Sequence, residues 1–369
     1  MKITIFGSGI YNALIGMPPG GAELQTSLFA KAFKNYGFDV TIIDNFKSGK
    51  STNIEGIKII FSASINIKIL RYFFQRIPRI IYYSLFKNTH YFFVRSVNQI
   101  FLIPLLISKI KRIHFIYSIS SNIDCESFIK RLIYSYKVKV SLINWIKNDL
   151  PSSITNYFLL KFADSVLVQS NYQFEKLKKR DIKAIIFRNI IPFNSDNRKV
   201  IKKDYYVYIG SIARRKGIAE LLKLIKEIPE KQFIIIGAPQ GEFGKNAVEI
   251  FNRTSNIKYL GALNREKVIE YLLYSKALIN LSKVEGFPNT FLEAWSTFTP
   301  VISLYVNPDN VITDYNLGIY GNGNINSIIK YIKLNNINSI DNDNVLKYLK
   351  KYHNYDNAIE RLMSKIHNN

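Results

Sequence analysis

Short apolar runs rich in β-branched and aromatic residues alternate with segments of helical periodicity along most of the chain. The first run, Ile3–Phe6, leads through a glycine loop into a segment where Leu24, Leu28 and Ala32 recur every four residues and which Gly37 closes. Strands that alternate with helices form βαβ units around a parallel sheet. The pattern therefore predicts an α/β protein.

The alternation stops once and then restarts, which divides the chain into two domains. Asn194–Asp204 is polar and has no periodic apolar face, as expected for a linker. We predict an amino-terminal domain over residues 1–194 and a carboxy-terminal domain over residues 204–345. Residues 346–369 are predicted to form a helical tail that packs back towards the amino-terminal domain. A length of 369 residues agrees with two domains.

The expected strands follow from the same pattern, because each is a run of β-branched or aromatic residues bounded by turn residues. In the first half, after Ile3–Phe6, they are residues 39–43, 57–61, 91–94, 114–118, 165–169 and 184–187. In the second half they are residues 205–210, 232–239, 256–261, 277–282 and 300–305.

The excess of basic over acidic residues indicates which kinds of partner the chain attracts. The chain carries 51 Lys and Arg residues against 27 Asp and Glu residues, a formal charge of +24, which favours anionic partners. No helix-turn-helix, RNP or zinc pattern accompanies this charge, so specific recognition of nucleic acid is not expected. A basic nucleic-acid- or membrane-binding protein without catalysis is kept as an alternative.

The sequence also bears on the compartment. Cys125 is the single cysteine, which excludes an intrachain disulfide framework and fits a cytoplasmic location. We expect no secretory signal, because the chain opens with a strand that runs into a glycine turn. The longest uninterrupted apolar run, Ile100–Ile107, has eight residues. A membrane-spanning helix needs about 20.

Between Lys68 and Tyr117, basic residues are interleaved with Phe, Tyr and Ile. Two interpretations fit this stretch. It lies peripherally on an anionic membrane surface, the inner face of the cytoplasmic membrane, with its apolar side inserted. Alternatively, it forms buried helices with Lys and Arg at their edges.

In open parallel sheets, ligands bind at the loops that follow the carboxyl ends of the strands, and here those loops are rich in glycine. One of them, Gly210–Gly217, places Arg214, Arg215 and Lys216 directly before a helix. Helix amino termini carry partial positive charge and bind phosphate together with Arg and Lys. The loop is predicted to be either a phosphate site or a solvated basic loop.

A second loop of the same half holds two glutamates, Glu285 and Glu293, eight positions apart around a Gly-Phe-Pro-Asn turn. Pro288 suits the first position of a helix, so we expect a helix from near Asn289 with exposed backbone amides at its start. Glu293 then lies just over one turn into that helix. Taken singly, each acid is also explained as a surface residue near a helix start; the pair around this turn favours a binding site.

These residues carry a resemblance to a known family. Residues 285–293 resemble the E-x7-E pattern of retaining GT-B glycosyltransferases of family 4, also called glycosyl transferases group 1. The resemblance covers residues 1 to about 320 and is loosest between 45 and 160. It implies a GT-B fold, with two Rossmann-like domains whose parallel sheets face a central cleft. Other segments that resemble the family are residues 20–25, 187–192, 209–217, 256–282, 292–295 and 300–303.

The resemblance implies a transferase that moves a sugar from a UDP- or GDP-linked donor to a hydroxyl acceptor with retention of anomeric configuration. The donor would bind the carboxy-terminal domain, and a glycan or lipid-linked acceptor would bind the amino-terminal domain across the cleft. Glu293 would accept hydrogen bonds from the ribose hydroxyls, and Glu285 would contact the donor sugar or support its anomeric centre. Lys216, with Arg214 or Arg215, would neutralise the diphosphate. No cofactor is implied besides this co-substrate.

Backbone amides are implied to complete the diphosphate site. The chain departs from the family at Ser211, where Arg is usual, and at Phe298, where a small residue is usual. Arg214 or Arg215 is then expected to supply the missing cation. The further donor-binding residues implied by the resemblance are Gly20, Gly21, Gly210, Ser211, Gly237, Leu260, Gly286, Phe287, Asn289, Thr290, Phe291 and Leu292.

The acceptor side offers one candidate. Asp124 follows a mid-domain strand and joins Glu285 and Lys216 as a predicted catalytic residue; its alternative role is that of a helix cap. No metal site is expected, because the four histidines are scattered. The single D-x-D, Asp341–Asp343, is expected to cap a helix.

The sequence bears on two alternative enzyme classes. A dinucleotide-dependent oxidoreductase is disfavoured because Asn12 stands where the third glycine of the fingerprint belongs. Asp44 also lies 35 residues after Gly9, against about 20 in that motif. A nucleotide-sugar epimerase of GT-B fold stays open as an alternative, and analysis of the product separates it from a transferase.

Overall fold

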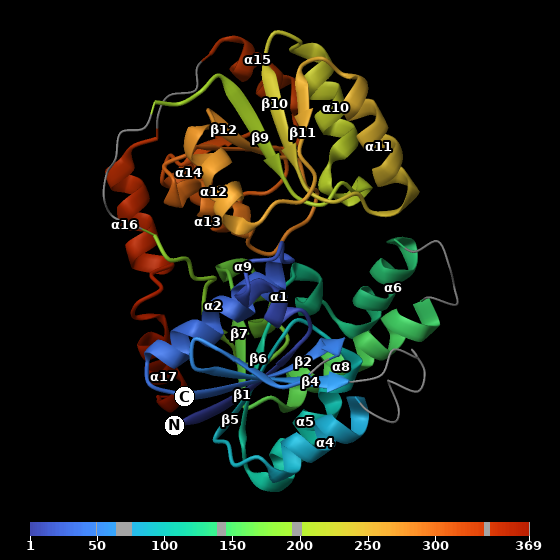
Figure 1. Cartoon of the computed structure of the whole chain (residues 1–369), viewed down its shortest axis with the longest axis vertical. Coiled ribbons are helices and arrows are strands. Elements are labelled where there is room, and N and C mark those ends of the chain that lie inside the picture. Colours follow the sequence, from blue (N-terminus) through green and yellow to red (C-terminus); the bar gives the residue numbers. More distant parts are fainter. Residues whose placement is uncertain (49, 64–75, 139–144, 194–200, 336–339, 369) are drawn as a thin grey trace. The chain divides into compact units, whose positions relative to one another are not determined.

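The computed structural model describes residues 1–48, 50–63, 76–138, 145–193, 201–335 and 340–368. The chain folds into two compact units, each built around one β-sheet (Figure 1). Most of the predicted linker, residues 194–200, lies outside the described residues. The α/β class predicted from the sequence is confirmed. The amino-terminal unit contains Met1–Ile15, Pro19–Ile190 and Asp356–Asn369, and the carboxy-terminal unit contains Gly16–Pro18 and Ile191–Tyr355.

The amino-terminal unit contains an eight-stranded sheet in the order β3-β4-β2-β1-β5-β6-β7-β8. Neighbouring strands are parallel except β3 and β4. The inner strands are buried on both faces, which explains their near-continuous apolar sequences. The sequence did not predict β3, because its three residues form no apolar run. The strands are β1 Lys2–Gly7, β2 Asp39–Ser48, β3 Thr52–Ile54, β4 Ile57–Ala63, β5 Tyr91–Arg95, β6 His114–Ser118, β7 Ser165–Val168 and β8 Ile185–Ile186.

Helices cover both faces of this sheet (Figure 1). On one face, Ile80, Leu105 and Leu159 join a core with the side chains of the central strands. On the other face, Phe29 meets Phe93 of β5 edge to face, with ring centroids 5.9 Å apart. The helical elements of this unit are α1 Ile10–Leu14, α2 Gly21–Asn35, α4 Ile77–Phe86, η2 Gln99–Phe101, α5 Leu102–Lys111, η3 Asn122–Cys125, α6 Phe128–Val138, η4 Trp145–Asp149, α8 Leu150–Phe162, α9 Asn171–Lys178 and α17 Ala358–His367.

The carboxy-terminal unit contains a six-stranded parallel sheet in the order β11-β10-β9-β12-β13-β14. The sequence did not predict β14, a three-residue strand at the sheet edge. The strands are β9 Tyr205–Ile209, β10 Gln232–Ile236, β11 Ile257–Tyr259, β12 Ala277–Asn280, β13 Val301–Ser303 and β14 Gly318–Tyr320. The helical elements are η5 Arg214–Lys216, α10 Ile218–Glu227, α11 Gly241–Arg253, α12 Arg265–Tyr274, α13 Asn289–Ser296, η6 Pro308–Asn310, α14 Val311–Asp314, α15 Ile325–Lys333 and α16 Asn342–Tyr352.

Helix α13 is anchored by the fully buried Trp295. Its indole N–H donates to the carbonyl of Leu317 at 3.0 Å, and its ring meets Tyr348 of α16 edge to face at 5.6 Å. This packing places α16 in the carboxy-terminal unit, so the predicted start of the tail at residue 346 falls inside a helix that begins at Asn342. Asp341 accepts a hydrogen bond from the Asp343 amide and caps α16, as expected.

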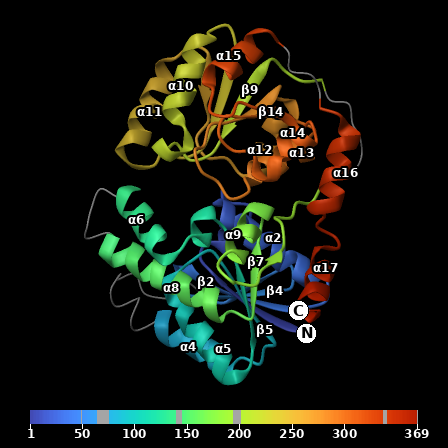
Figure 2. The same cartoon turned by 180° about the vertical axis from the view of Figure 1, so that it is seen from behind.

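The last helix, α17, returns to the amino-terminal unit. It packs near α2, and Tyr91 of β5 contacts His367 with 3.4 Å between the hydroxyl and Nε2. Figures 1 and 2 show the two chain ends side by side in this unit. No described helix combines the length and apolar character needed to cross a membrane.

Candidate functional site

Three loops meet at the carboxyl edge of the carboxy-terminal sheet. They follow β9, β10 and β12, which are neighbours in that sheet. A Cβ atom on Gly237 would lie 1.9 Å from the Gly210 carbonyl oxygen, and one on Gly217 would lie 2.0 Å from the Leu281 carbonyl oxygen. Only glycine allows backbones to approach this closely. The glycine-rich loops predicted from the sequence therefore form one continuous surface where parallel sheets bind ligands.

The basic loop after β9 presents its three cations differently. Arg214 is exposed and its guanidinium lies over the Phe243 ring, 4.8 Å from the centroid. Arg215 is also exposed. Lys216 is partly buried, and Gly217 follows it with a φ of 75° that starts α10. The loop thus turns Lys216 inward and holds Arg214 against α11.

Lys216 forms an ion pair with Glu285. The two side chains are 20% and 17% exposed, so solvent screens the pair only in part. They are 69 positions apart in the sequence, and the contact joins the loop after β9 to the loop after β12. Two of the three predicted catalytic residues are therefore neighbours in the fold.

Tyr208 contacts the basic loop after β9 and was not predicted from the sequence. It is buried, and its hydroxyl donates to the Ser211 carbonyl at 3.2 Å. Burial raises the pKa of Tyr208, the Glu285 carboxylate adds to the rise and the Arg215 guanidinium opposes it. Arg215 and Glu285 therefore act on the same buried hydroxyl. The signal in the sequence was an aromatic residue two positions before Gly210.

The amino terminus of α13 differs in one detail from the prediction. Pro288 is the N-cap rather than the first helical residue, because its ψ of 125° is extended. The helix begins at Asn289, and no side chain caps its first turn. Asn289 and Thr290, the first two residues of the helix, are half-buried. This is the arrangement that binds anions at helix amino termini.

Three residues predicted to bind the donor are part of the core. Phe287, Phe291 and Leu292 are buried within the apolar cluster around Trp295. They can contribute only backbone atoms to a ligand. Leu260 is half-buried, and its amide donates to the Ile235 carbonyl at 3.0 Å.

Glu293 is buried on α13 with an exposed fraction of 5%, so the interpretation as a solvent-facing acid is wrong. Its Oε1 lies 3.3 Å from Nε of Arg265, the first residue of α12. Burial raises the pKa of Glu293, and Arg265 offsets part of that rise. Arg265 was not predicted; a basic residue directly after the β11–α12 loop was its only signal in the sequence.

In the amino-terminal unit, Gly20 is the N-cap of α2 and Gly21 is its first residue. The Glu23 carboxylate lies over this turn, because a Cβ atom on Gly20 would be 2.3 Å from Glu23 Oε2. The helix therefore carries an acid of its own at its positive end. The sequence interpretation did not single out Glu23.

Asp44 hydrogen-bonds to the glycine loop that follows β1 in this unit. Its carboxylate accepts hydrogen bonds from the amides of Gly9 at 3.0 Å and Tyr11 at 2.8 Å. In dinucleotide-binding folds the acid that ends the second strand binds a ribose instead. Asp44 is engaged with its own loop, which further disfavours a dinucleotide-dependent oxidoreductase.

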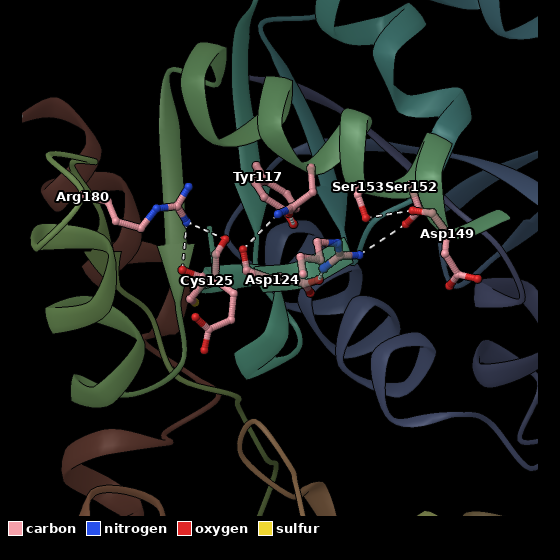
Figure 3. A network of polar contacts seen from close by, with 10 residues as sticks. Tyr117, Asp124, Cys125, Asp149, Ser152, Ser153 and Arg180 are labelled. Atoms are coloured by element: carbon pink, nitrogen blue, oxygen red, sulfur yellow. Dashed lines mark hydrogen bonds and ion pairs between the residues drawn. The ribbon is translucent and has the colours of Figure 1, made fainter. Parts of the chain in front are cut away.

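Asp124 lies in a closed polar network of the amino-terminal unit (Figure 3). It is buried in η3 and forms an ion pair with Arg131 of α6. Its carbonyl accepts from Asn156 Nδ2 at 3.0 Å, and Asn156 Oδ1 accepts from the Tyr117 hydroxyl at 2.7 Å. Burial raises the pKa of Asp124, and Arg131 offsets part of the rise.

Arg180 extends the same network by donating to the carbonyls of Cys125 and Glu126, both at 2.8 Å. The network ties η3, α6, α8 and the turn after α9 together. Asp124 is thus held by the fold, and its predicted role as a catalytic residue stays a prediction. Among the described residues, no group of three or more His, Cys, Asp or Glu side chains could hold a metal ion.

Residues 192–352 match the family model of Glycosyl transferases group 1. The match covers less than half of the chain and lies within its carboxy-terminal unit. The group 1 domain coincides with the unit that carries the Lys216–Glu285 pair and α13. The match agrees with the resemblance to glycosyl transferases group 1 found in this part of the sequence.

Two curated relatives are similar to parts of the chain. An uncharacterised glycosyltransferase of Methanocaldococcus jannaschii is 24% identical over 205 residues, which are 46% of this chain and 50% of that protein. The capsular polysaccharide biosynthesis glycosyltransferase CapH of Staphylococcus aureus is 29% identical over 132 residues, 33% of this chain and 36% of that protein. The chain spans half or less of the length of these relatives.

The likeness to solved structures extends over both units. TarM of Staphylococcus aureus matches with a TM-score of 0.75 and 12% identity, over 99% of each chain. At this identity the likeness concerns the fold alone. The two α/β domains with largely parallel sheets are those of the GT-B fold, as the sequence resemblance implied.

Proposed function

We propose that the protein is a retaining glycosyltransferase that moves a sugar from a UDP- or GDP-linked donor to a hydroxyl acceptor. The observation that carries the proposal is the Lys216–Glu285 ion pair beside the uncapped start of α13, within a group 1 domain. A cation, a carboxylate and the amino terminus of a helix without a side-chain cap are thus close together in the fold. A diphosphate linked to a sugar offers the complementary groups.

The donor is proposed to lie along this surface with its nucleoside towards Glu293. The buried carboxylate of Glu293 would accept hydrogen bonds from the two ribose hydroxyls, while Arg265 fixes its orientation. Lys216 and the α13 amides would bind the diphosphate. Lys216 would then be shared between Glu285 and phosphate, which leaves the Glu285 carboxylate available to the sugar hydroxyls.

Arg215, rather than Arg214, is proposed as the second cation of the diphosphate site. Arg214 is directed to the Phe243 ring. Arg215 is exposed on the same loop, and its guanidinium opposes the rise in the pKa of Tyr208. It would replace the arginine that the family usually has at the position of Ser211.

In the proposed reaction, the bond between the anomeric carbon and the phosphate oxygen breaks as the acceptor oxygen bonds to the same carbon from the same face. The leaving diphosphate takes the proton of the acceptor hydroxyl. Lys216, Arg215 and the helix amides stabilise the charge that develops on the diphosphate. The anomeric configuration is retained without a covalent intermediate, and no metal ion is required.

The acceptor is proposed to be a glycan or lipid-linked glycan used in cell-surface polysaccharide or glycolipid assembly, with the enzyme in the cytoplasm. The name of the Staphylococcus aureus relative, which refers to capsular polysaccharide biosynthesis, supports this class of acceptor. TarM was solved in complex with UDP and α-GlcNAc-glycerol, which supports UDP as the nucleotide to test first.

A thermal-shift panel of UDP-sugars and GDP-sugars tests the donor, because a ligand that binds the folded state raises the unfolding temperature by mass action. We expect a shift with one nucleotide class and not the other. Incubation of that donor with hydroxyl acceptors should then give a glycoside of retained configuration by NMR, also in EDTA. Interconversion of the nucleotide-sugar without acceptor would instead indicate an epimerase, and no shift with any donor would overturn the proposal.

A further inference from the structure

Helix α8 exposes an apolar face to solvent. Ile154, Tyr157, Phe158 and Phe162 are 37%, 42%, 38% and 43% exposed, and their spacing of three or four places them on one side of the helix. A helix on the surface of a globular protein normally turns polar residues outward. In α8 several polar residues are buried instead: Ser153, Thr155 and Asn156.

The aromatic rings on this face are clustered rather than scattered. The rings of Phe158 and Phe162 stack with 5.9 Å between their centroids. Tyr157 meets Phe158 at 5.6 Å and Phe128 of α6 at 6.3 Å. The Lys161 ammonium lies 5.9 Å and 5.5 Å from the centroids of Tyr157 and Phe162. A cation is thus set among the exposed rings.

Neighbouring helices extend the same surface. Figures 1 and 2 show α4, α5, α8 and α6 as a continuous row, with α4 next to α5, α5 next to α8, and α8 next to α6. Thirteen of the 23 exposed large hydrophobic side chains among the described residues lie between Ile81 and Phe162. We call their surface the apolar-basic face; its apolar members are Ile81, Tyr82, Phe86, Leu106, Ile110, Ile129, Ile133, Tyr134, Ile146, Ile154, Tyr157, Phe158 and Phe162.

The charge on these helices has one sign. In the described part of residues 77–164, Asp164 is the only exposed acid, and it pairs with Lys109 at 2.6 Å. The exposed basic residues there are Lys109, Lys111, Arg112, Lys130, Lys147 and Lys161. The face therefore combines apolar groups with an uncompensated positive charge.

We propose that the apolar-basic face docks on an anionic lipid bilayer. Aromatic and aliphatic side chains enter the boundary between headgroups and acyl chains, while Lys and Arg contact anionic headgroups. A second copy of the chain would bring like charges together across a two-fold axis. Nucleic acid would complement the charge but leave the apolar side chains in water.

The surface differs from the stretch that the sequence indicated. A membrane surface and buried helices were the two interpretations of Lys68–Tyr117, and residues 68–75 of that stretch lie outside the described residues. Helices α4 and α5 fall within the rest of that stretch. Helices α6 and α8 lie beyond it, and they carry the aromatic cluster with Lys130 and Lys161.

Co-sedimentation of the full chain with vesicles tests the proposal. We expect binding to phosphatidylglycerol–phosphatidylcholine vesicles at low ionic strength, weakening with added salt, and little binding to pure phosphatidylcholine. Phe158→Ser with Phe162→Ser, and separately Lys130→Glu with Lys161→Glu, should each weaken binding by about tenfold or more. The matched control is Lys245→Glu with Ile250→Ser on α11, whose side chains are also exposed, and it should bind like the wild type.

Several results would overturn the proposal: no wild-type binding at low ionic strength, equal binding to neutral vesicles, or equal loss in the control. Lipid-free self-association that is abolished by Phe158→Ser with Phe162→Ser would show a second copy as the occupant instead. Circular dichroism checks that each variant is folded. The vesicle assay uses no sugar donor, so its outcome is independent of the proposed transferase activity.

Discussion

Each unit contains one buried carboxylate paired with an arginine: Glu293 with Arg265, and Asp124 with Arg131. In both, burial raises the pKa of the acid and the arginine offsets part of the rise. The surroundings differ. Arg131 is 12% exposed and Arg265 is 27% exposed. A perturbed acid alone therefore does not distinguish a binding group from a structural one.

The distinction comes from what surrounds the pair. The carbonyls of Asp124 and Cys125 accept hydrogen bonds within the network of Figure 3. Glu293 instead has one long contact to Arg265 and sits on a helix whose first turn has no side-chain cap. We therefore propose the carboxy-terminal pair as the one that binds a ligand's hydroxyls, and the amino-terminal pair as a structural one.

The largest effect is expected at Lys216. Lys216→Ala removes the cation that we propose to stabilise the charge developing on the diphosphate. Loss of one such group lowers turnover by roughly 10²–10³-fold. Steady-state kinetics with the natural donor measures this, and Lys216→Arg should recover part of the rate. Equal turnover in Lys216→Ala and wild type would contradict the role proposed for this loop.

Asp124 should matter for stability more than for chemistry. Asp124→Ala leaves the largely buried Arg131 without a counter-charge, at a cost of about 3 kcal/mol in the free energy of unfolding. Urea unfolding measures the loss, and Asp124→Asn should lose less because its amide oxygen still accepts from Arg131. Full stability with abolished turnover in Asp124→Asn would instead support the catalytic role predicted from the sequence.

Glu293→Ala should weaken nucleotide binding by about 10–100-fold, the range for hydrogen bonds to a charged group. Turnover at saturating donor should change less than KM. Titration calorimetry and kinetics measure the two quantities, and Arg265→Lys provides a milder perturbation of the same carboxylate. A variant with unchanged affinity would remove Glu293 from the donor site.

Because the pKa of Glu293 is raised, the effect of removing its charge on stability should depend on pH. The folded protein holds this proton more tightly than the unfolded chain, so ionised Glu293 costs stability as pH rises through its folded pKa. Glu293→Gln should therefore raise the unfolding temperature at pH 7, and the gain should fade towards about pH 4, where exposed glutamates titrate. Nucleotide affinity of the wild type should fall as acid protonates Glu293. A pH-independent stability difference between Glu293→Gln and wild type would contradict this assignment.

The smallest effect separates two adjacent arginines. Arg215→Ala should lower turnover by about tenfold, as expected for loss of a partly screened charge near the diphosphate. Arg214→Ala serves as the matched control and should remain near the wild-type rate, because Arg214 contacts Phe243. The reverse ranking would show that the basic loop rearranges when the donor binds.

Local pattern was enough to predict the alternating architecture and the loops after β9 and β12, because strand runs, glycine turns and cation clusters are short-range signals. Such local signals cannot predict contacts between residues that are far apart in the sequence. Nothing local indicates that Lys216 meets Glu285, 69 positions away, or that Arg265 meets Glu293.

The sequence also could not predict which of these side chains are buried. Helical spacing on α13 cannot tell a buried Glu293 from an exposed one, since that depends on which side Trp295 packs. Helix α8 shows the same ambiguity in reverse, because its aromatic stripe would ordinarily predict a buried face. Three-residue strands such as β3 and β14 form only through their neighbours in the sheet.

The most direct test of the central claim is titration of UDP and, separately, GDP into three purified proteins: wild type, Glu293→Ala and Asp124→Asn. We predict that one nucleotide binds the wild type and Asp124→Asn with similar affinity, and that Glu293→Ala binds it at least about tenfold more weakly. Binding that is lost in Asp124→Asn but kept in Glu293→Ala, or no binding of either nucleotide to the wild type, would contradict a donor site on the carboxy-terminal unit.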